Sequence, residues 1–392
     1  MQRSVSGFSI LFLALTYVAA AQQPASTPIT VDCSKGQSLN QTLAKLDRQT
    51  PYSVSVNGTC SEFVQVIGFH NLMLKGLHGA TLVQPSTGWE TSAYATLFIG
   101  SSQSVQVEGF SVQGSGAPWF FNIGITHGSS DIRLRSLNIQ GQGIAVAENS
   151  QVSIAYVHVQ ASSFSSLVIG DSSDVHVEHC LFENTASDGW HAGIDLGASH
   201  VTMYATTIRN MQVGINGWAD SIVDLVVYNA YYVTTGNTDV VIDSSAGTNL
   251  NGVALTGGSL NVNGAKLVIN KSGHSSGGTT SGVFLDQGAT MYAASGYLSL
   301  SGSMGQGIVA MNNSHATVDG AIIARGGHAG LLAINHSSID VANIHNLLST
   351  IGGNAVDLFC DSDSKITGTA NIAGSPKAQC TNLLSSETVP LP

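Results

Sequence analysis

The segments DIRLRSLNIQ (residues 131–140), QVSIAYVHVQ (151–160) and DVHVEHCLFE (174–183) share one spacing of apolar residues. In each, apolar side chains occupy the first, third, sixth and eighth places of an eight-residue frame. The frame recurs along the chain, mostly at steps of 20 to 31 residues. It begins again at Val105, Val201, Leu260, Met291 and Ala316. A period in this range is typical of stacked supersecondary units, none of which buries its apolar side alone.

A second signature accompanies the frame, a glycine followed by alternating apolar residues. It is seen at Gly143-Ile144, Gly193-Ile194, Gly214-Ile215, Gly252-Val253, Gly282-Val283, Gly307-Ile308 and Gly330-Leu331. The two signatures together predict an all-β, single-stranded parallel β-helix of about eleven coils from Leu97 to Leu358. Two other repeat folds do not fit. A leucine-rich repeat needs a Leu-rich consensus with an Asn ladder, which is absent, and a propeller needs four antiparallel strands per repeat of about 40 residues.

With these residues in view, the chain resembles the right-handed parallel β-helix proteins of the pectin-lyase-like superfamily, of the secreted bacterial type. Besides the repeats, the resemblance rests on the run VDCSKGQSLNQTLAKL (31–46) followed by VSVNGTCSEFVQV (54–66). It covers most of residues 29–380. It implies the fold but no single activity, because the superfamily includes lyases, hydrolases, esterases, adhesins and phage spikes.

The first residues are typical of a secretory signal, with Arg3 before the apolar run Ile10 to Leu15 and small residues at Ala19 to Ala21. The alternative, a membrane anchor, would need an apolar run of roughly 20 residues. We therefore expect a secreted, periplasmic or cell-surface protein. Its expected parts are the signal (1–21) and one domain (22–392) with a cap (29–60), coils (about 61–360) and a C-terminal closure (360–392).

The cysteines fit an oxidising compartment. Pairing Cys33 with Cys60 and Cys360 with Cys380 would place one disulfide at each end of the solenoid, where such structures fray. Cys180 occupies an inward place of the repeat frame, so we expect a buried, unreactive side chain.

A short amphipathic helix is predicted before the repeats. Residues 38–48 carry Leu39, Leu43 and Leu46 at helical spacing, and Ser38 is a suitable N-cap. This helix is well placed to cover the open first coil.

Charge narrows the class of partner. Only 9% of the residues are charged, and 13 Lys and Arg give no basic surface for nucleic acid. The same scarcity argues against a strongly acidic polymer as substrate. No later segment is apolar enough to span a membrane. The expected partner is an extracellular polysaccharide.

The loops before the glycine strands vary most in length, so function is expected there. The outward residues of the glycine strands should form a groove floor, polar mainly at Asp195 and Asn216. By counting along each strand, this floor is predicted to contain Phe98, Thr126, Ala145, Val168, Asp195, Asn216, Ala254, Phe284, Val309, Leu332 and Asp357.

Two carboxylates near aromatic rings predict a site that binds or cleaves a sugar chain, because glycosidic cleavage uses one protonated and one ionised carboxyl. The candidate catalytic residues are Asp188, Asp195 and His191. The candidate substrate-binding residues are Trp119, Trp190, Asn216, Trp218 and Tyr231. The alternative is structural: Asp188-Gly189 is an ordinary turn signal, and loop aromatics often pack over a solenoid.

Family motifs leave enzymatic activity undecided between a polysaccharide lyase, a glycoside hydrolase and a non-catalytic surface, adhesion or structural protein. The adjacent aspartates and the Gly-His-Gly and Arg-x-Lys motifs of polygalacturonase-like enzymes are absent. Arg209 is a basic residue in the central coils without an obvious acidic cluster for lyase chemistry. No metal site or cofactor is predicted; calcium is conceivable, but its nonapeptide repeat motif is missing.

Three outward apolar residues, Phe284, Val309 and Leu332, predict an apolar stripe over consecutive C-terminal coils. Exposed stripes of this kind are usually covered. We expect cover from the C-terminal tail, around Leu383 and Leu384, or from a second copy in a homo-oligomer.

Overall fold

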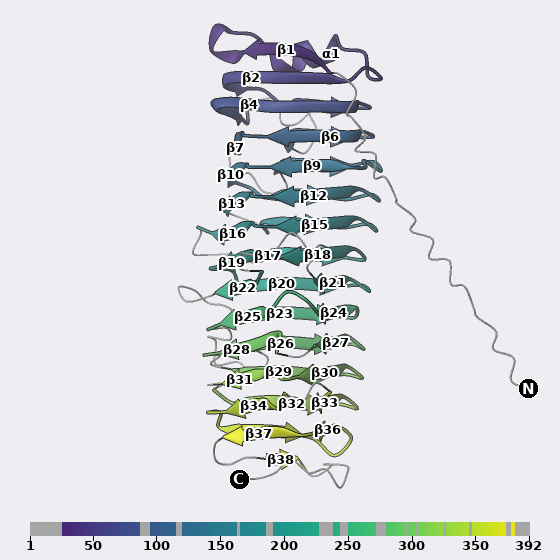
Figure 1. The fold of residues 1–392 in the computed structure, drawn as a ribbon, viewed down its shortest axis with the longest axis vertical. Helices are drawn as coiled ribbons and strands as arrows, with labels where there is room; N and C mark the ends of the chain where they lie inside the picture. Colours follow the sequence, from purple (N-terminus) through teal and green to yellow (C-terminus); the bar gives the residue numbers. More distant parts are fainter. Residues whose placement is uncertain are drawn as a thin grey trace, which may run out of the picture.

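The computed structural model describes residues 26–86, 95–114, 120–162, 165–185, 191–226, 238–243, 250–271, 280–294, 296–302, 305–324, 327–344, 347–373 and 378–380. In these residues, parallel strands stack into one column (Figure 1). Helix α1 (Leu39–Ala44) and strand β1 (Thr27–Asp32) lie at the N-terminal end of the column, and β38 (Ala378–Cys380) lies at the other. The predicted secretory signal lies outside the described residues.

Each coil contributes one strand to a 13-stranded parallel sheet, which we call face I. Its strands are β3 (Val64–Ile67), β5 (Ala95–Gly100), β8 (Phe121–Thr126), β11 (Ile144–Val146), β14 (Leu167–Ile169), β17 (Ala192–Gly197), β20 (Val213–Trp218), β23 (Asn251–Thr256), β26 (Ser281–Asp286), β29 (Gln306–Met311), β32 (Ala329–Ile334), β35 (Val356–Cys360) and β38. Eleven of them run from β5 to β35, as predicted from Leu97 to Leu358.

The remaining strands form two further faces. Face II consists of β6 (Gln103–Glu108), β9 (Ile132–Arg135), β12 (Gln151–Ala155), β15 (Asp174–Glu178), β18 (His200–Tyr204), β21 (Ile222–Leu225), β24 (Ser259–Val262), β27 (Thr290–Ala293), β30 (His315–Asp319), β33 (Ser338–Ala342) and β36 (Lys365–Gly368). Face III consists of β7 (Ser111–Gln113), β10 (Asn138–Gly141), β13 (His158–Ala161), β16 (Leu181–Asn184), β19 (Thr206–Arg209), β22 (Val240–Asp243), β25 (Leu267–Asn270), β28 (Leu298–Ser301), β31 (Ile322–Ala324), β34 (Ser349–Gly352) and β37 (Ala370–Ala373).

Two long strands, β2 (Tyr52–Ser61) and β4 (His70–Val83), start the column. Strand β4 pairs with both β6 and β7, so it runs through the corner between faces II and III. Faces II and III therefore belong to one 25-stranded sheet.

The four apolar places of the repeat frame form the core. In the first frame, Val105, Val107 and Val112 are fully buried and Phe110 is 2% exposed. The first two places lie on face II and the last lies on face III, while the third follows the tight corner between them. The frame is confirmed as the set of inward side chains, and its regular spacing reflects the strict register of the parallel ladders.

One repeat escaped the sequence pattern. Val223 and Leu225 on β21 and Val240 and Ile242 on β22 are buried at the four inward places, but residues 227–237 lie between the two strands. Both strands pair in register with their neighbours. These four residues are thus a further frame whose two halves are separated by residues 227–237.

A buried serine stack marks the corner between faces I and II. Ser150, Ser173 and Ser199 are among its members, and each lies two residues before the next frame. The Ser173 hydroxyl accepts the backbone N–H of Ser150 at 3.2 Å, and the Ser199 hydroxyl accepts that of Ser173 at 3.2 Å. Buried N–H groups need partners, so the serines link successive coils where the strand ladder is interrupted.

The glycine signature has a steric cause on face I. A Cβ added to Gly252 would lie 2.6 Å from the carbonyl oxygen of Gly282 and 2.6 Å from Cγ2 of Ile269. The equivalent glycines have the same surroundings, a carbonyl oxygen from the next coil and a branched side chain from face III. They are Gly193, Gly214, Gly282, Gly307 and Gly330.

We predict that Gly252→Ala lowers stability by about 1–3 kcal/mol, because a methyl group must displace backbone as well as a buried isoleucine. Urea unfolding followed by circular dichroism measures the change. Gly170→Ala is the matched control, because a Cβ there meets nothing within 4 Å, and it should stay within about 0.5 kcal/mol of the parent. Equal effects of the two substitutions would contradict the steric explanation.

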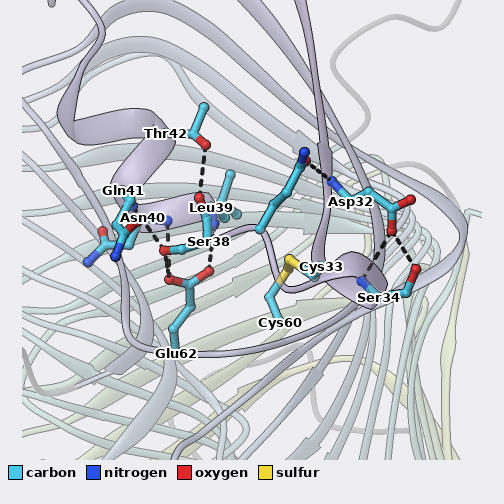
Figure 2. The surroundings of a disulfide bond; sticks show 11 residues. Asp32, Cys33, Ser34, Ser38, Leu39, Asn40, Gln41, Thr42, Cys60 and Glu62 are labelled. Atoms are coloured by element: carbon cyan, nitrogen blue, oxygen red, sulfur yellow. Dashed lines mark hydrogen bonds between the residues drawn. A yellow bond between two sulfur atoms is a disulfide. The ribbon is translucent and has the colours of Figure 1, made fainter.

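The N-terminal cap is confirmed and involves one residue that the sequence did not indicate (Figure 2). Ser38 is the N-cap of α1, and its hydroxyl accepts the N–H of Gln41 at 3.0 Å. Glu62 accepts the N–H of Leu39 at 2.7 Å and the hydroxyl of Ser38 at 2.6 Å. The helix is shorter than predicted and ends at Ala44, although Leu39 and Leu43 are fully buried over the first coil.

Both predicted disulfides are present, Cys33–Cys60 and Cys360–Cys380. Cys180 is a buried free cysteine, and burial raises the pKa of its thiol to about 12, which keeps it protonated and unreactive. No helix in the described ranges is long and apolar enough to cross a membrane.

Candidate functional site on face I

The register of face I gives its outward row directly. Starting from Phe98, each outward residue pairs with the next through β8, β11, β14 and the following strands. The observed row is Gln65, Phe98, Gly124, Ala145, Val168, Asp195, Asn216, Ala254, Phe284, Val309, Leu332, Phe359 and Gln379.

Two members of the predicted floor are therefore wrong. Gly124 takes the place assigned to Thr126, and Phe359 takes the place assigned to Asp357, which is fully buried. The errors have one cause. Counting from the glycine assumes that every strand begins at the same distance from its glycine. Strands β8 and β35 begin at other distances.

Asp195 and Asn216 are the adjacent polar members of the row, as predicted, and they bind each other. They are a register pair on β17 and β20, and Nδ2 of Asn216 donates to Oδ1 of Asp195 at 2.8 Å. In the described strands β14 and β20 on either side of β17 there is no second carboxylate.

Trp218 provides an aromatic surface next to this pair. It pairs in register with Gly197, and a Cβ on Gly197 would lie 2.4 Å from Cζ2 of the indole. The ring thus covers the backbone of Gly197, and any side chain at position 197 would clash with it. Despite this contact Trp218 is 52% exposed, which makes it an accessible aromatic ring beside Asp195.

Burial raises the pKa of the Asp195 carboxyl. Hydrogen bonds from Asn216 and Trp218 act in the opposite direction but do not cancel the effect of burial. Asp195 is a half-buried carboxyl that accepts hydrogen bonds from two neutral side chains. Such a group is suited to hydrogen-bonding a neutral hydroxyl group.

The other predicted site residues divide into two groups. His191 is described and is 2% exposed, and it precedes Asp195 by four residues along an extended segment, about 13 Å. Its backbone carbonyl accepts the N–H of Gln212 at 3.0 Å. The remaining candidates lie outside the described residues. They are Asp188, Trp190, Trp119 and Tyr231.

Sequence reasoning missed an ionic cluster on face III. Arg209 pairs with a single carboxylate: its Nε and Nη2 donate to Oε2 of Glu183 at 2.7 and 2.6 Å. His158 Nε2 and Gln160 Nε2 lie 2.7 and 2.9 Å from Oε1 of Glu183. The register signal was available, because Gln160, Glu183 and Arg209 occupy one outward row of face III.

Burial raises the pKa of Glu183, but hydrogen bonds from Gln160, Arg209 and His158, with the charge of Arg209, outweigh it. The pKa of Glu183 is therefore below its usual value, and the group stays ionised. A carboxylate whose two oxygens are occupied by donors on neighbouring strands clamps the coils together and is a poor proton donor for catalysis.

The predicted apolar stripe exists as a register row, but it is not an exposed one throughout. Val309 is 2% exposed and lies between Phe284 and Leu332, which are half-buried. Leu383 and Leu384, the residues expected to cover the stripe, lie outside the described part. The homo-oligomer stays a prediction.

One group of side chains in the described residues is close enough to hold a metal ion, Cys33, Cys60 and Glu62. The two sulfurs are joined in a disulfide, and Glu62 accepts hydrogen bonds from the start of α1. These atoms are therefore committed to the cap (Figure 2).

Comparison with known proteins agrees with the fold of the column. The family model for the right-handed beta helix region matches residues 91–230. The catalytic domain of GH87 alpha-1,3-glucanase in complex with nigerose has a TM-score of 0.50 and 10% identity, covering 90% of this chain and 70% of that one. A second structure of that domain with nigerose gives a TM-score of 0.51 at the same identity and coverage. No curated protein matches the sequence.

Proposed function

We propose that this chain, a right-handed parallel β-helix protein of the pectin-lyase-like type, recognises an extracellular polysaccharide on face I around Trp218. The observation that carries the proposal is the half-exposed indole of Trp218, seated on Gly197 beside Asp195 and Asn216. An aromatic face beside polar groups of fixed direction suits a sugar ring, which has apolar C–H faces and hydroxyl edges. The similar glucanase domain, whose structure is in complex with nigerose, supports this class of ligand.

Recognition fits the described residues better than cleavage. Cleavage of a glycosidic bond uses two carboxyl groups, about 5 Å apart in retaining enzymes and 6.5–9.5 Å apart in inverting ones. Asp195 is the one carboxylate that the described strands β14, β17 and β20 place in this part of face I. For any hydrolytic activity we propose Asp188 as the second carboxyl, with His191 assisting, and Trp119, Trp190 and Tyr231 as further contacts.

The deciding experiment compares binding of the parent and Trp218→Ala to a panel of insoluble and soluble polysaccharides. We expect the substitution to weaken binding at least tenfold, about 1.4 kcal/mol, because aromatic anchors dominate binding energy. Tyr292→Ala, an exposed aromatic on face II, is the control and should bind like the parent. Unchanged binding by Trp218→Ala would refute the proposal. New reducing ends in the same incubations would indicate cleavage.

The raised pKa of Asp195 gives a prediction about stability and pH. The folded protein retains this proton to higher pH than the unfolded chain, whose value is near 3.8. The stability due to this carboxyl is fully present below pH 3.8 and is lost as the pH rises through the raised pKa. We therefore expect Asp195→Asn to be at least as stable as the parent at pH 7 while losing polysaccharide binding.

Melting temperatures of both proteins between pH 3.5 and 7 test this, and the gap should grow in favour of Asp195→Asn as the pH rises. Asp47→Asn is a control in which the pH dependence should have the opposite sign, because a hydrogen bond from the Thr50 hydroxyl lowers the pKa of Asp47. A melting temperature of Asp195→Asn below that of the parent at pH 7 would show that the carboxylate stabilises the fold instead.

A further inference from the structure

A cleft lies on face II, on a different face of the column from Asp195 and Asn216. Its volume is about 520 Å³, and it crosses strands β9, β12, β15 and β18. Its polar lining consists of Asp131, Gln151, Ser153, Asp174, His176 and Thr202. These side chains stand on consecutive strands of one rigid ladder, because Ser153, His176 and Thr202 are register neighbours, as are Gln151 and Asp174.

The two carboxylates of the cleft have partners in the protein itself. Asp131 is paired with Arg133 at 2.9 Å. Asp174 lies 3.1 Å from Nδ1 of His200, whose Nε2 lies 3.0 Å from Asp224. The carboxylates therefore do not call for a cationic ligand, and the amide, hydroxyl and carboxylate groups remain as hydrogen-bonding partners for a neutral one.

Spacing argues against a shared metal ion. Asp131 precedes Ile132 on β9 and is level with Gln151 and Asp174, so the two aspartates are two strands apart. Two strand spacings amount to about 9.5 Å, too far for two carboxylates to bind one cation at 2–2.6 Å.

Aromatic side chains border the cleft at the corner between faces II and III. His176, which lines the cleft, lies 5.7 Å from the ring centre of Tyr204. His179 stacks on Tyr156 at 4.9 Å between ring centres, with the rings 5° from parallel. Tyr156 is 49% exposed, and the guanidinium of Arg135 also lies over its ring, 5.4 Å from the ring centre. This pairing of a polar floor with an aromatic border suits a ligand that has both hydroxyls and apolar faces.

We propose that the cleft on face II is a second saccharide-binding site, which takes a neutral oligosaccharide segment lying across β9 to β18. It is separate from the site around Trp218 and does not depend on it. The carboxylates accept hydrogen bonds from sugar hydroxyls, and the Gln151 amide both donates and accepts them. A concave site with a few convergent polar groups on rigid strands is the usual form of a small-ligand site.

The test is affinity electrophoresis in native gels that contain dextran, soluble starch, galactomannan or β-glucan, with polygalacturonate as an anionic comparison. Each protein is measured with and without Trp218→Ala, so that binding on face I does not mask the second site. The Gln151→Ala/Ser153→Ala variant removes two outward polar side chains. We expect it to weaken retardation by at least one neutral polysaccharide on the order of tenfold in Kd.

The matched control is Thr290→Ala/Tyr292→Ala, at the same two outward places of face II on β27, five strands further along. It should leave retardation unchanged. No retardation of the Trp218→Ala protein by any neutral polysaccharide would overturn the second site while leaving the proposed function standing. Equal Kd values for Gln151→Ala/Ser153→Ala and its parent would also overturn it, as would stronger retardation by polygalacturonate. The double variant Gln151→Ala/Ser153→Ala, without Trp218→Ala, could lose binding while Trp218→Ala keeps it. That result would support the cleft and refute the site on face I.

Discussion

Phe182→Ala is expected to destabilise the protein by about 3–5 kcal/mol, the largest effect that we predict for a single substitution. Phe182 is fully buried on β16 and is one of the largest such side chains in the described core. It lies level with Val159 and Ile208 on the neighbouring coils. Truncation leaves a cavity that rigid ladders on both sides cannot close, so the loss includes a cavity contribution as well as lost burial.

Urea unfolding followed by circular dichroism measures this loss, and Leu181→Ala is its control on the same strand. Leu181 faces outward and is half-buried, so its truncation should cost less than about 1 kcal/mol. Because each coil contacts only its neighbours, the transition should also broaden or split as the central coils weaken. A loss below about 1 kcal/mol for Phe182→Ala would mean that the coils collapse around the missing ring.

The second large effect is expected at the N-terminal end. Replacing both Cys33 and Cys60 by Ser should destabilise the protein by about 3–4 kcal/mol, because the disulfide closes a loop with a sequence separation of 27. The loss should concentrate on β1, β2 and α1, since ends of solenoids fray first. Hydrogen exchange of the backbone amides in these elements is the direct measurement, with faster exchange expected there than in β12 or β15.

The Cys360→Ser/Cys380→Ser variant is the matched comparison, with a sequence separation of 20. The chain-entropy argument gives it nearly the same magnitude, about 3 kcal/mol, but faster exchange should appear around β35 and β36 instead. Uniform acceleration along the column in either variant would contradict local fraying. Glu62→Ala separately tests what the hydrogen bonds of α1 contribute to the cap, because it removes the acceptor for the α1 N-terminus and leaves the disulfide in place.

Several features of the fold could be read from the sequence because they repeat. The apolar frame predicted the inward residues of faces II and III, and the glycine signature predicted the strands of face I. Local chemistry gave the Ser38 N-cap and the cysteine pairs. The serine stack was also visible in principle, because Ser150, Ser173 and Ser199 each precede a frame by two residues.

Other features depend on lengths that no local pattern specifies. The apolar frame of β21 and β22 was missed because residues 227–237 separate its two halves. Thr126 and Asp357 were misplaced because strand offsets differ from coil to coil. The pairing of Arg209 with Glu183 was not predicted, because Glu183 is 26 residues away and becomes adjacent only through strand pairing.

The sequence by itself therefore determined that this chain is a β-helix, which side chains face its core, and that Asp195 and Asn216 lie together. A periodic apolar pattern suffices for this, because burial is decided coil by coil. Only the tertiary structure decided what the outward side chains do. It laid Trp218 over Gly197, joined Glu183 to Arg209 and formed the cleft of face II. Outward side chains carry no burial signal, and their neighbours are fixed by the register between strands some twenty residues apart.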